Sequence, residues 1–538
     1  MKKYLLILLL LLVPVYGWGA TYYSRIIAGT IYYKSAEWPV ATDTSAASLQ
    51  AMVNALDNGG HTLVLDAASA WTGANGTITF AGDNITIRAP LSTDPEFATY
   101  GGRVTIGPSA SADYIIKIGT ARTGITLSGA ITFAGYNGFN FGTVSIQSTA
   151  NNINISRTWD NGAWQTPIIT SANDASDFPI YIFGDGTGDP SNIVLDGLDI
   201  RNYRVDTQGI KINTADAGTG NEIKNCTIMN YTPHAAGTIA GSGIFLIDSN
   251  RWSIHDNIIG NTTYRWQNGI RFQASDNNLI YNNTISYCWD GDNYPDADGY
   301  GITVQTSSEN NLIYKNLIQY SNRGVGLSSN AGAGGNTVFY NVIANSPTNG
   351  IDVTASMDAY ELVYNNTVYH RPTSTSGHGI VVQSTGKKAK IYNNIVDTYT
   401  MQNRPHNIQC IAIADTAGPS VYTVEIDYNL YYVTGTAYVG AEDETNMASL
   451  SDWTTAIADN TGIIGKDAHS VSVDPLFISA TNYRLSNTSP AISAGTFITG
   501  VHDQPGATDY EGKSFYCMPS CDIGAYSVVK ATEEGMSE

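Results

Sequence analysis

Short apolar strands recur between residues 200 and 400, and each is introduced by a glycine. They have the sequences QGIKIN, SGIFLI, NGIRFQ, YGITVQ, RGVGLS, NGIDVT and HGIVVQ, and their first glycines follow one another after 34, 26, 32, 23, 26 and 29 residues. Between these strands apolar and polar residues alternate over runs of four or five positions, which is the periodicity of a β-strand. The pattern predicts a chain that winds in coils of about one repeat each, with three short strands per coil.

A second recurring position is an asparagine at a turn. It is occupied by Asn257, Asn283, Asn316, Asn341, Asn366 and Asn394, by Asn429 in a looser match, and by Cys226 in an earlier coil. Asparagine tolerates left-handed backbone angles and can hydrogen-bond to neighbouring backbone, so we expect these side chains to form a buried amide ladder. A single coil cannot bury its inward residues, but stacked coils about 4.8 Å apart share one core. The sequence therefore predicts an all-β solenoid.

The two ends of the repetitive region have different patterns. Residues 44–60, TSAASLQAMVNALDNGG, are expected to form a short amphipathic helix that covers the open edge of the first coil. Past residue 435 the repeat stops, and SLSDWTTAIADN is typical of a helix. We predict a signal peptide over 1–19, the solenoid over 20–434, a C-terminal cap or appended region over 435–528, and a disordered tail over 529–538.

The first residues have the composition of a secretory signal. Lys2 and Lys3 precede an apolar run over 4–15 and the small residues Gly17 and Gly19. The run is shorter than the roughly 20 residues that span a bilayer. We expect a secreted protein, extracellular, periplasmic or at the cell surface, and a monomer.

Charge and cysteine content narrow the function further. The formal net charge of −20, from 47 acidic and 27 basic residues, repels nucleic acid and anionic membranes at long range, so neither is an expected partner. Five cysteines are too few for a disulfide framework. Cys517 and Cys521 are predicted to form a local disulfide, whereas Cys226 and Cys410 are expected to pack in the core.

The NNTI and GI repeats resemble those of the pectate-lyase-like β-helix superfamily. The segments DPLF, YRLSNTSPAISAG and CDIGAY are similar to the C-terminal signature of many bacterial secreted β-helix proteins, and together these motifs cover most of residues 40–528. The resemblance implies a right-handed parallel β-helix with a polysaccharide groove along one row of strands. That superfamily includes lyases, hydrolases, epimerases, phage spikes and adhesins, so the resemblance specifies the fold more strongly than the activity.

Strand alternation assigns the exposed face of the glycine strands. The first outward row is Lys211, Phe245, Arg271, Thr303, Gly326, Asp352 and Val381, and the second is Asn213, Ile247, Gln273, Gln305, Ser328, Thr354 and Gln383. The loops that precede the strands are expected to overhang this face. The predicted substrate-binding residues are Arg265, Trp266, Trp289, Tyr300, Gln273, Gln305, Asp352, Arg371 and His378.

One loop is rich in carboxylates. Asp290, Asp292, Asp296 and Asp298 lie within nine residues, and clustered carboxylates suit Ca²⁺. The sequence does not fit an EF-hand loop. We expect a calcium site beside the strand row.

These features favour a calcium-assisted polysaccharide lyase that cleaves an acidic glycan by β-elimination. Such a reaction needs a cation for the substrate carboxylate, a base for the C5 proton and a group that stabilises the leaving oxygen. Arg271, Arg323 and Lys211 are the catalytic candidates, and the choice of base stays open because arginine normally remains protonated. Two alternatives remain, a noncatalytic glycan-binding protein and a glycoside hydrolase that pairs carboxyl groups from Asp296, Asp298 and Asp352.

Overall fold

The computed structural model describes residues 20–528 with internal gaps. The gaps are 28–29, 42, 57–58, 70, 72–77, 101, 108–113, 135–142, 171–177, 185–188, 203–206, 215–217, 231–240, 264, 290–298, 329–333, 355–358, 372–375, 384–387, 400–406, 415–422, 443–444, 500, 503–507 and 514–519. The predicted signal peptide and the predicted tail over 529–538 lie outside the described residues.

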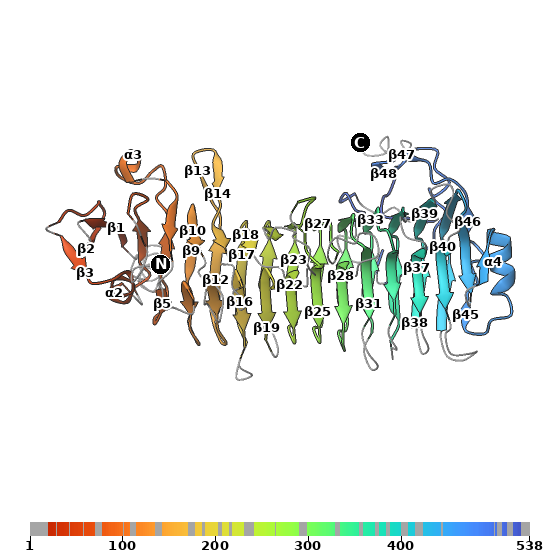
Figure 1. Ribbon diagram of the computed structural model, residues 1–538, viewed down its shortest axis with the longest axis horizontal. Helices are drawn as coiled ribbons and strands as arrows, with labels where there is room; N and C mark the ends of the chain where they lie inside the picture. The colour runs from red at the N-terminus through yellow and green to blue at the C-terminus, as the bar shows by residue number, and fades with distance from the viewer. Residues whose placement is uncertain are drawn as a thin grey trace, which may run out of the picture.

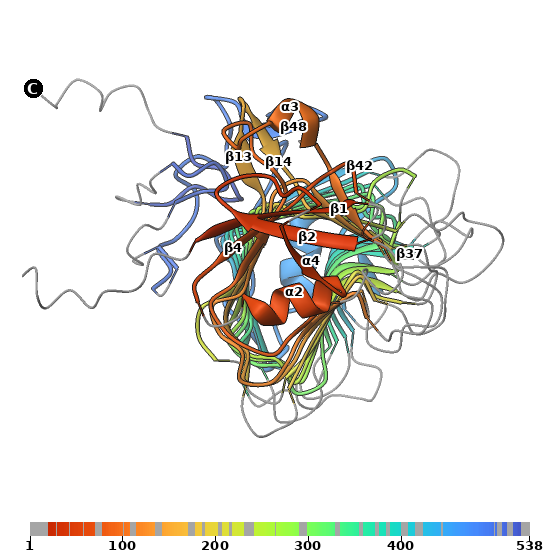
Figure 2. The same cartoon turned by 90° about the vertical axis from the view of Figure 1, so that its left-hand side faces the viewer.

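The described chain winds into a right-handed parallel β-helix with three long sheets, as predicted (Figure 1). Sheet A has 17 described strands, sheet B 13 and sheet C 14. One coil contributes one strand to each sheet, for example β26 (Leu279–Tyr281), β27 (Thr284–Ser286) and β28 (Tyr300–Gln305). Seen along its long axis, the solenoid has all its coils stacked over one another (Figure 2).

The strands of the three sheets are bounded as follows. Sheet A consists of β1 (Thr21–Ile27), β2 (Thr30–Ser35), β3 (Thr44–Ala46), β4 (Thr62–Leu65), β6 (Thr86–Arg88), β9 (Thr126–Ser128), β12 (Asn151–Ser156), β17 (Ser191–Asp196), β20 (Asn221–Lys224), β23 (Trp252–His255), β26, β29 (Leu312–Tyr314), β32 (Thr337–Phe339), β35 (Glu361–Tyr364), β38 (Lys388–Tyr392), β41 (Thr423–Asp427) and β45 (Ile463–Ile464). Sheet B consists of β7 (Val104–Ile106), β10 (Ile131–Ala134), β15 (Ile168–Thr170), β18 (Asp199–Asn202), β21 (Thr227–Asn230), β24 (Ile258–Ile259), β27, β30 (Leu317–Gln319), β33 (Val342–Ala344), β36 (Thr367–His370), β39 (Ile395–Tyr399), β42 (Leu430–Thr434) and β46 (Val471–Ser472). Sheet C consists of β5 (Ile78–Phe80), β8 (Ile116–Ile118), β11 (Val144–Ile146), β16 (Ile180–Phe183), β19 (Ile210–Asn213), β22 (Ser242–Ile247), β25 (Asn268–Gln273), β28, β31 (Arg323–Ser328), β34 (Asn349–Val353), β37 (Ser376–Gln383), β40 (Asn407–Ala414), β43 (Tyr438–Glu442) and β44 (Thr445–Met447). Two hairpins stand apart from the sheets, β13 (Thr158–Asp160) with β14 (Ala163–Gln165) and β47 (Phe477–Ser479) with β48 (Asn482–Leu485).

The predicted asparagine ladder is present and buried. Each side-chain amide donates to the side-chain oxygen one coil further on, at 3.0 Å from Asn283 to Asn316, from Asn316 to Asn341 and from Asn341 to Asn366. The left-handed backbone lies one residue earlier than expected, at residues such as Lys315 (φ 55°). The ladder asparagines therefore act through their amides, and their predecessors make the turn.

A second ladder was not predicted. Directly before strands β26, β29 and β32 of sheet A, the Asn278 amide donates to Asn311, and Asn311 donates to Asn336, both at 2.9 Å. The Asn336 amide then donates to Oε1 of Glu361 at 2.9 Å, and Glu361 has no exposed surface. A carboxyl group thus ends a ladder of neutral amides inside the protein.

The repeat glycines are required by close packing between coils. A Cβ atom built on Gly243 would lie 2.7 Å from the carbonyl oxygen of Gly269, and one built on Gly269 would lie 2.5 Å from that of Gly301. Glycine is needed here because a side chain would separate adjacent coils, not because the backbone is left-handed.

Helices lie at both ends of the solenoid. Helix α2 (Leu49–Ala55) falls inside the predicted range, contributes Leu49, Met52 and Val53 to the core, and lies across the N-terminal end in Figure 2. A short helix, α3 (Phe97–Tyr100), lies between β6 and β7. Helix α4 (Leu450–Ala456) begins at a Ser449 capping box. Its buried Trp453 donates to Asp467 at 2.7 Å.

The C-terminal region is not a separate unit from residue 435 onward. Strands β43, β45 and β46 continue the three sheets, so the last coil ends near Ser472, later than the predicted boundary. The chain then returns along sheet B, where the Asn365 amide donates to the Asp522 carbonyl at 3.0 Å (Figure 1). In the described part of the chain, no helix combines the length and hydropathy needed to cross a bilayer.

The cysteines are consistent with their predicted roles as far as they are described. Cys226, Cys288 and Cys410 are free and buried. Cys521 is disulfide-bonded, while Cys517, its predicted partner, lies outside the described residues.

Candidate functional site

The predicted outward row lies in register on sheet C. Lys211 pairs with Phe245, Phe245 with Arg271 and Arg271 with Thr303, and the row continues through Gly326, Asp352 and Val381. It also extends backward from Lys211 to Tyr181 on β16. Residues dozens of positions apart in the chain therefore become neighbours along one face.

A pocket of about 270 Å³ lies on this face, over β28, β31, β34 and β37. It is lined by Tyr300, Arg323, Thr348, Asn349, Asp352, Thr354, Gly377, His378 and Gln383. Four residues that the sequence proposed independently, Tyr300, Arg323, Asp352 and His378, come together here. We call this the sheet C pocket.

Tyr300, Arg323 and Asp352 form a connected polar network in the sheet C pocket. The Arg323 Nη1 donates to the Tyr300 hydroxyl oxygen at 3.1 Å, and its Nε lies 3.5 Å from Oδ2 of Asp352. The Tyr300 hydroxyl is near enough to Asp352 to favour its ionised form and so to oppose the rise in its pKa. The Asn349 amide donates to Oδ1 of Asp352 at 2.6 Å.

Burial controls the protonation of the two titratable groups at the back of the pocket. Asp352 is 2 % exposed, and its desolvation raises its pKa to about 6 despite the opposing effects of Arg323, Asn349 and Tyr300. Burial lowers the pKa of His378 to about 4, partly offset by a hydrogen bond with Gln409. At neutral pH the imidazole is therefore uncharged, and the carboxyl group is close enough to its pKa to gain or lose a proton.

Two of the three predicted catalytic residues lie outside the sheet C pocket. Arg271 donates to Gln305 at 3.0 Å and lies over the Phe245 ring, and Lys211 lies over the Tyr181 ring, further along the row. Burial lowers the pKa of both cations. Of the three predicted catalytic residues, only Arg323 belongs to the polar network of the sheet C pocket.

The two tryptophans among the predicted substrate-binding residues are not accessible. Trp266 has no exposed surface and donates from its indole nitrogen to the Ile228 carbonyl at 3.2 Å. Trp289 is 4 % exposed, and the Arg265 guanidinium lies 4.5 Å from its ring centroid. Trp266 packs into space that the repeat glycines leave open, since a Cβ on Gly209 would lie 3.3 Å from its ring. The prediction that these two rings bind substrate is therefore wrong.

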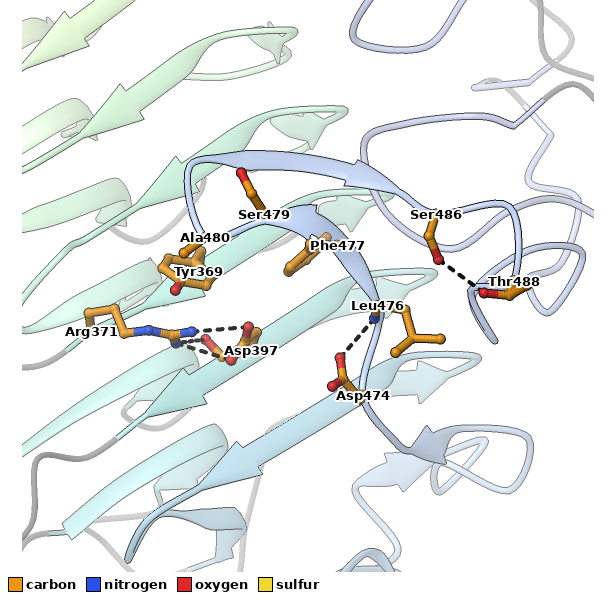
Figure 3. Close-up of a pocket in the computed structure, with 10 residues that line it drawn as sticks. All are labelled: Tyr369, Arg371, Asp397, Asp474, Leu476, Phe477, Ser479, Ala480, Ser486 and Thr488. Atoms are coloured by element: carbon orange, nitrogen blue, oxygen red, sulfur yellow. Dashed lines mark hydrogen bonds and ion pairs between the residues drawn. The ribbon is translucent and has the colours of Figure 1, made fainter.

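Arg371 lies on a different face from the one expected. It directly follows β36 of sheet B and lines a pocket of about 400 Å³ between that sheet and the C-terminal segment (Figure 3). Its guanidinium lies 3.4 Å from the Tyr369 ring centroid and hydrogen-bonds to both carboxylate oxygens of Asp397, at 3.0 and 3.1 Å. The residue is held by its own sheet and does not reach the row on sheet C.

The predicted calcium ligands Asp290, Asp292, Asp296 and Asp298 lie outside the described residues. The flanks of their loop are next to the site, since the Gly299 carbonyl accepts from the Arg323 backbone N–H at 2.9 Å. Within the described ranges, no group of three or more His, Cys, Asp or Glu side chains could hold a metal ion.

Sequence reasoning missed Thr348, Asn349 and Gly377 in the pocket lining. Asn349 occupies the position before the repeat glycine, as Tyr300 and His378 do. That shared position was a usable signal. The Thr348 hydroxyl donates to Asn322 at 2.7 Å, a contact that only the folded coil reveals.

The chain is similar to one family model and, at low sequence identity, to several solved structures. The family model of the periplasmic copper-binding protein (NosD) matches residues 172–373. No curated protein sequence matches the chain. Among solved structures, a double mutant of the periplasmic alginate epimerase AlgG is 11% identical over 82% of this chain and 86% of its own, with a TM-score of 0.35. The pectate lyase Pel9A is 16% identical over 90% and 92%, with a TM-score of 0.33. A mutant tailspike protein of E. coli bacteriophage HK620 is 12% identical over 77% and 75%, with a TM-score of 0.37. The chain is a right-handed parallel β-helix protein.

Proposed function

We propose that this protein is a secreted polysaccharide lyase that binds an acidic glycan along sheet C and cleaves it by β-elimination in the sheet C pocket. The observation that carries the proposal is the network of Tyr300, Arg323 and Asp352, located in a pocket on a long, partly cationic strand row. The network supplies a cation, a proton-transferring oxygen and a proton acceptor, because Arg323 lies 3.1 Å from the Tyr300 oxygen and 3.5 Å from the Asp352 carboxylate.

Each group has a role in the proposed elimination. Arg323 binds the uronate carboxylate and, by donating to the Tyr300 oxygen, favours negative charge there. Asp352 accepts the phenolic proton, and the resulting phenolate removes the proton at C5. The C4–C5 double bond forms as the C4–O bond breaks. The electron pair of that bond goes to the leaving oxygen, which takes a proton from the Tyr300 hydroxyl. Asp352 then returns its proton to the Tyr300 phenolate, which restores the starting state.

A hydrolase is less well supported by the same geometry. Glycoside hydrolysis usually needs two carboxyl groups that flank the bond. Asp352 is the one carboxyl group among the described residues that line the pocket. A single carboxyl group beside a phenol and a guanidinium suits proton abstraction better.

We also propose that Ca²⁺ assists binding through Asp290, Asp292, Asp296 and Asp298. The segment that carries these carboxylates ends at Gly299, whose carbonyl accepts from the Arg323 backbone N–H. A bound Ca²⁺ ion there would offer the substrate carboxylate a further ligand contact. Calorimetric titration with calcium, compared between the unmodified chain and Asp298→Ala, tests this independently of activity. An identical calcium isotherm for both proteins would remove calcium from the proposal.

The activity is tested by incubating the purified protein with pectin, alginate and glycosaminoglycans. We expect ultraviolet absorbance from an unsaturated product, and a loss of about 10²-fold or more in rate for Tyr300→Phe. Tyr314→Phe, a matched change on sheet A, controls for general effects on folding. New reducing ends without absorbance would indicate a hydrolase, and retention of a glycan without any product would indicate a binding protein.

A further inference from the structure

Aromatic and cationic side chains alternate along the outer face of sheet C. Six successive strands, β16, β19, β22, β25, β28 and β31, carry Tyr181, Lys211, Phe245, Arg271, Tyr300 and Arg323 in that order. The first four lie in one register row. Tyr300 is not itself a member of this row. Its ring nevertheless lies over Gly326, which is a member.

Each cation lies over the ring of the preceding strand. The distances from charge to ring centroid are 5.2 Å for Lys211 and Tyr181, 4.7 Å for Arg271 and Phe245, and 5.1 Å for Arg323 and Tyr300. We call these three units the ring–cation pairs. The third is part of the sheet C pocket, and the other two continue the same arrangement away from it.

The first two pairs carry positive charge that the described protein does not neutralise. Neither Lys211 nor Arg271 forms an ion pair with a carboxylate within the described ranges. Cations on the other faces do so, namely Arg88, Arg157, Arg201, Lys224, Arg371 and Lys390. In a chain of net charge −20, two half-buried cations without a carboxylate on one row form a local anion-binding surface.

The spacing of the pairs determines which anion fits. Strands in a sheet are about 4.8 Å apart, so one pair follows another after about 10 Å. In an extended chain of equatorially linked pyranose rings, the distance from one ring to the next is similar to the distance between two neighbouring strands. Successive rings also alternate in orientation. Every second ring then presents its substituents to the same side.

We infer that the ring–cation pairs bind a linear acidic polysaccharide whose carboxylates face the protein on every second sugar. The inference rests on the proposed function for the acidic glycan and names its class. Such a chain is either a polyuronate in a two-fold ribbon or an alternation of uronate with a neutral sugar. The aromatic ring of each pair holds its cation on the row through a cation–π contact.

The test is a binding series with the full-length chain carrying Tyr300→Phe, so that no probe is consumed. Mannuronate and hyaluronan di- to octasaccharides represent the two sources of the proposed charge pattern, and galacturonate oligomers, which twist differently, are the comparison. We expect affinity to increase in steps as each disaccharide is added. Lys211→Gln and Arg271→Gln should each weaken octasaccharide binding by about tenfold, leave disaccharide binding unchanged and reduce the salt dependence. Lys390→Gln on sheet A should have no effect.

The outcomes separate this inference from the proposed function. If acidic glycans are cleaved but the two substitutions leave octasaccharide affinity unchanged, or affinity grows without two-residue steps, the inference is wrong and the lyase stands. If the stepwise binding is present but the unmodified chain forms no product, the lyase is wrong and the ring–cation pairs stand. If no acidic oligosaccharide binds, both are wrong.

Discussion

Glu361→Gln tests whether a carboxyl group at the end of an amide ladder is neutral inside the folded protein. Glu361 has no exposed surface, its Oε1 accepts from Asn336, and its Oε2 has no hydrogen-bond partner among the described residues. Burial raises its pKa from an ordinary 4.5 to about 8, against the opposing hydrogen bonds of Asn336. Glutamine keeps the shape and the accepting oxygen but cannot ionise.

The sign and size of the effect follow from proton linkage. Because the folded-state pKa is higher than the unfolded one, the folded protein holds this proton between pH 4.5 and about 8 while the unfolded chain has lost it. The free energy of unfolding therefore falls by about 1.4 kcal/mol for each pH unit over that window. The total reaches about 5 kcal/mol as an upper limit.

The assay is thermal and urea unfolding of both proteins from pH 5 to pH 9. We expect nearly equal stability at pH 5 and a growing advantage for Glu361→Gln toward pH 9. Glu222→Gln is the matched control, because hydrogen bonds from Lys224 and His255 hold the Glu222 pKa below its ordinary range despite partial desolvation. Glu222→Gln should be less stable than the unmodified chain at neutral pH, and this difference in the free energy of unfolding should shrink as the pH falls. A constant difference between Glu361→Gln and the unmodified chain at every pH would refute the reasoning.

Three further predictions concern the ladder, the glycines and the site. Asn316→Ala removes the partner of Asn283 and leaves buried groups unsatisfied, so we expect a loss of about 3 kcal/mol in urea unfolding; a loss near zero would contradict the ladder's role. Gly301→Ala places a Cβ 2.9 Å from the Gly324 carbonyl oxygen, and calorimetry should show about 2 kcal/mol of destabilisation, whereas unchanged stability would show that the coils can separate. The kcat/KM of the unmodified chain should rise as the pH passes about 6, where Asp352 ionises; Asp352→Asn should lower the rate and abolish that rise, and a surviving acid limb would assign it to another group.

The strand row could be predicted because it depends on a period alone. Once the glycine strands are aligned, alternation fixes which side chains face outward, and the register of Lys211, Arg271 and Asp352 agrees with that alignment. The asparagine ladder follows for the same reason. The strand row and the asparagine ladder each follow from the sequence of a single repeat, and stacking the coils places the same position of every repeat in line.

Features that depend on corners and long connections could not be predicted. Trp266 lies in a variable loop, where no period determines whether a ring turns inward. Arg371 follows directly on a sheet B strand, and its contact with Asp397 depends on the next coil. The C-terminal segment is held on sheet B by hydrogen bonds such as that from Asn393 to the Thr496 carbonyl, which joins residues 103 positions apart. Only the folded chain brings such partners together.

The column of repeat glycines has a consequence for evolution of this surface. A carbonyl oxygen of one coil occupies the space that a side chain at the repeat glycine of the neighbouring coil would need. The close spacing of the coils therefore depends on these glycines and not on the outward residues. Outward residues can then be exchanged without altering the interval between them. A protein of this type can acquire specificity for a different polymer by substitution on its surface. The interval at which it recognises that polymer stays the strand spacing of about 4.8 Å, which the glycines permit.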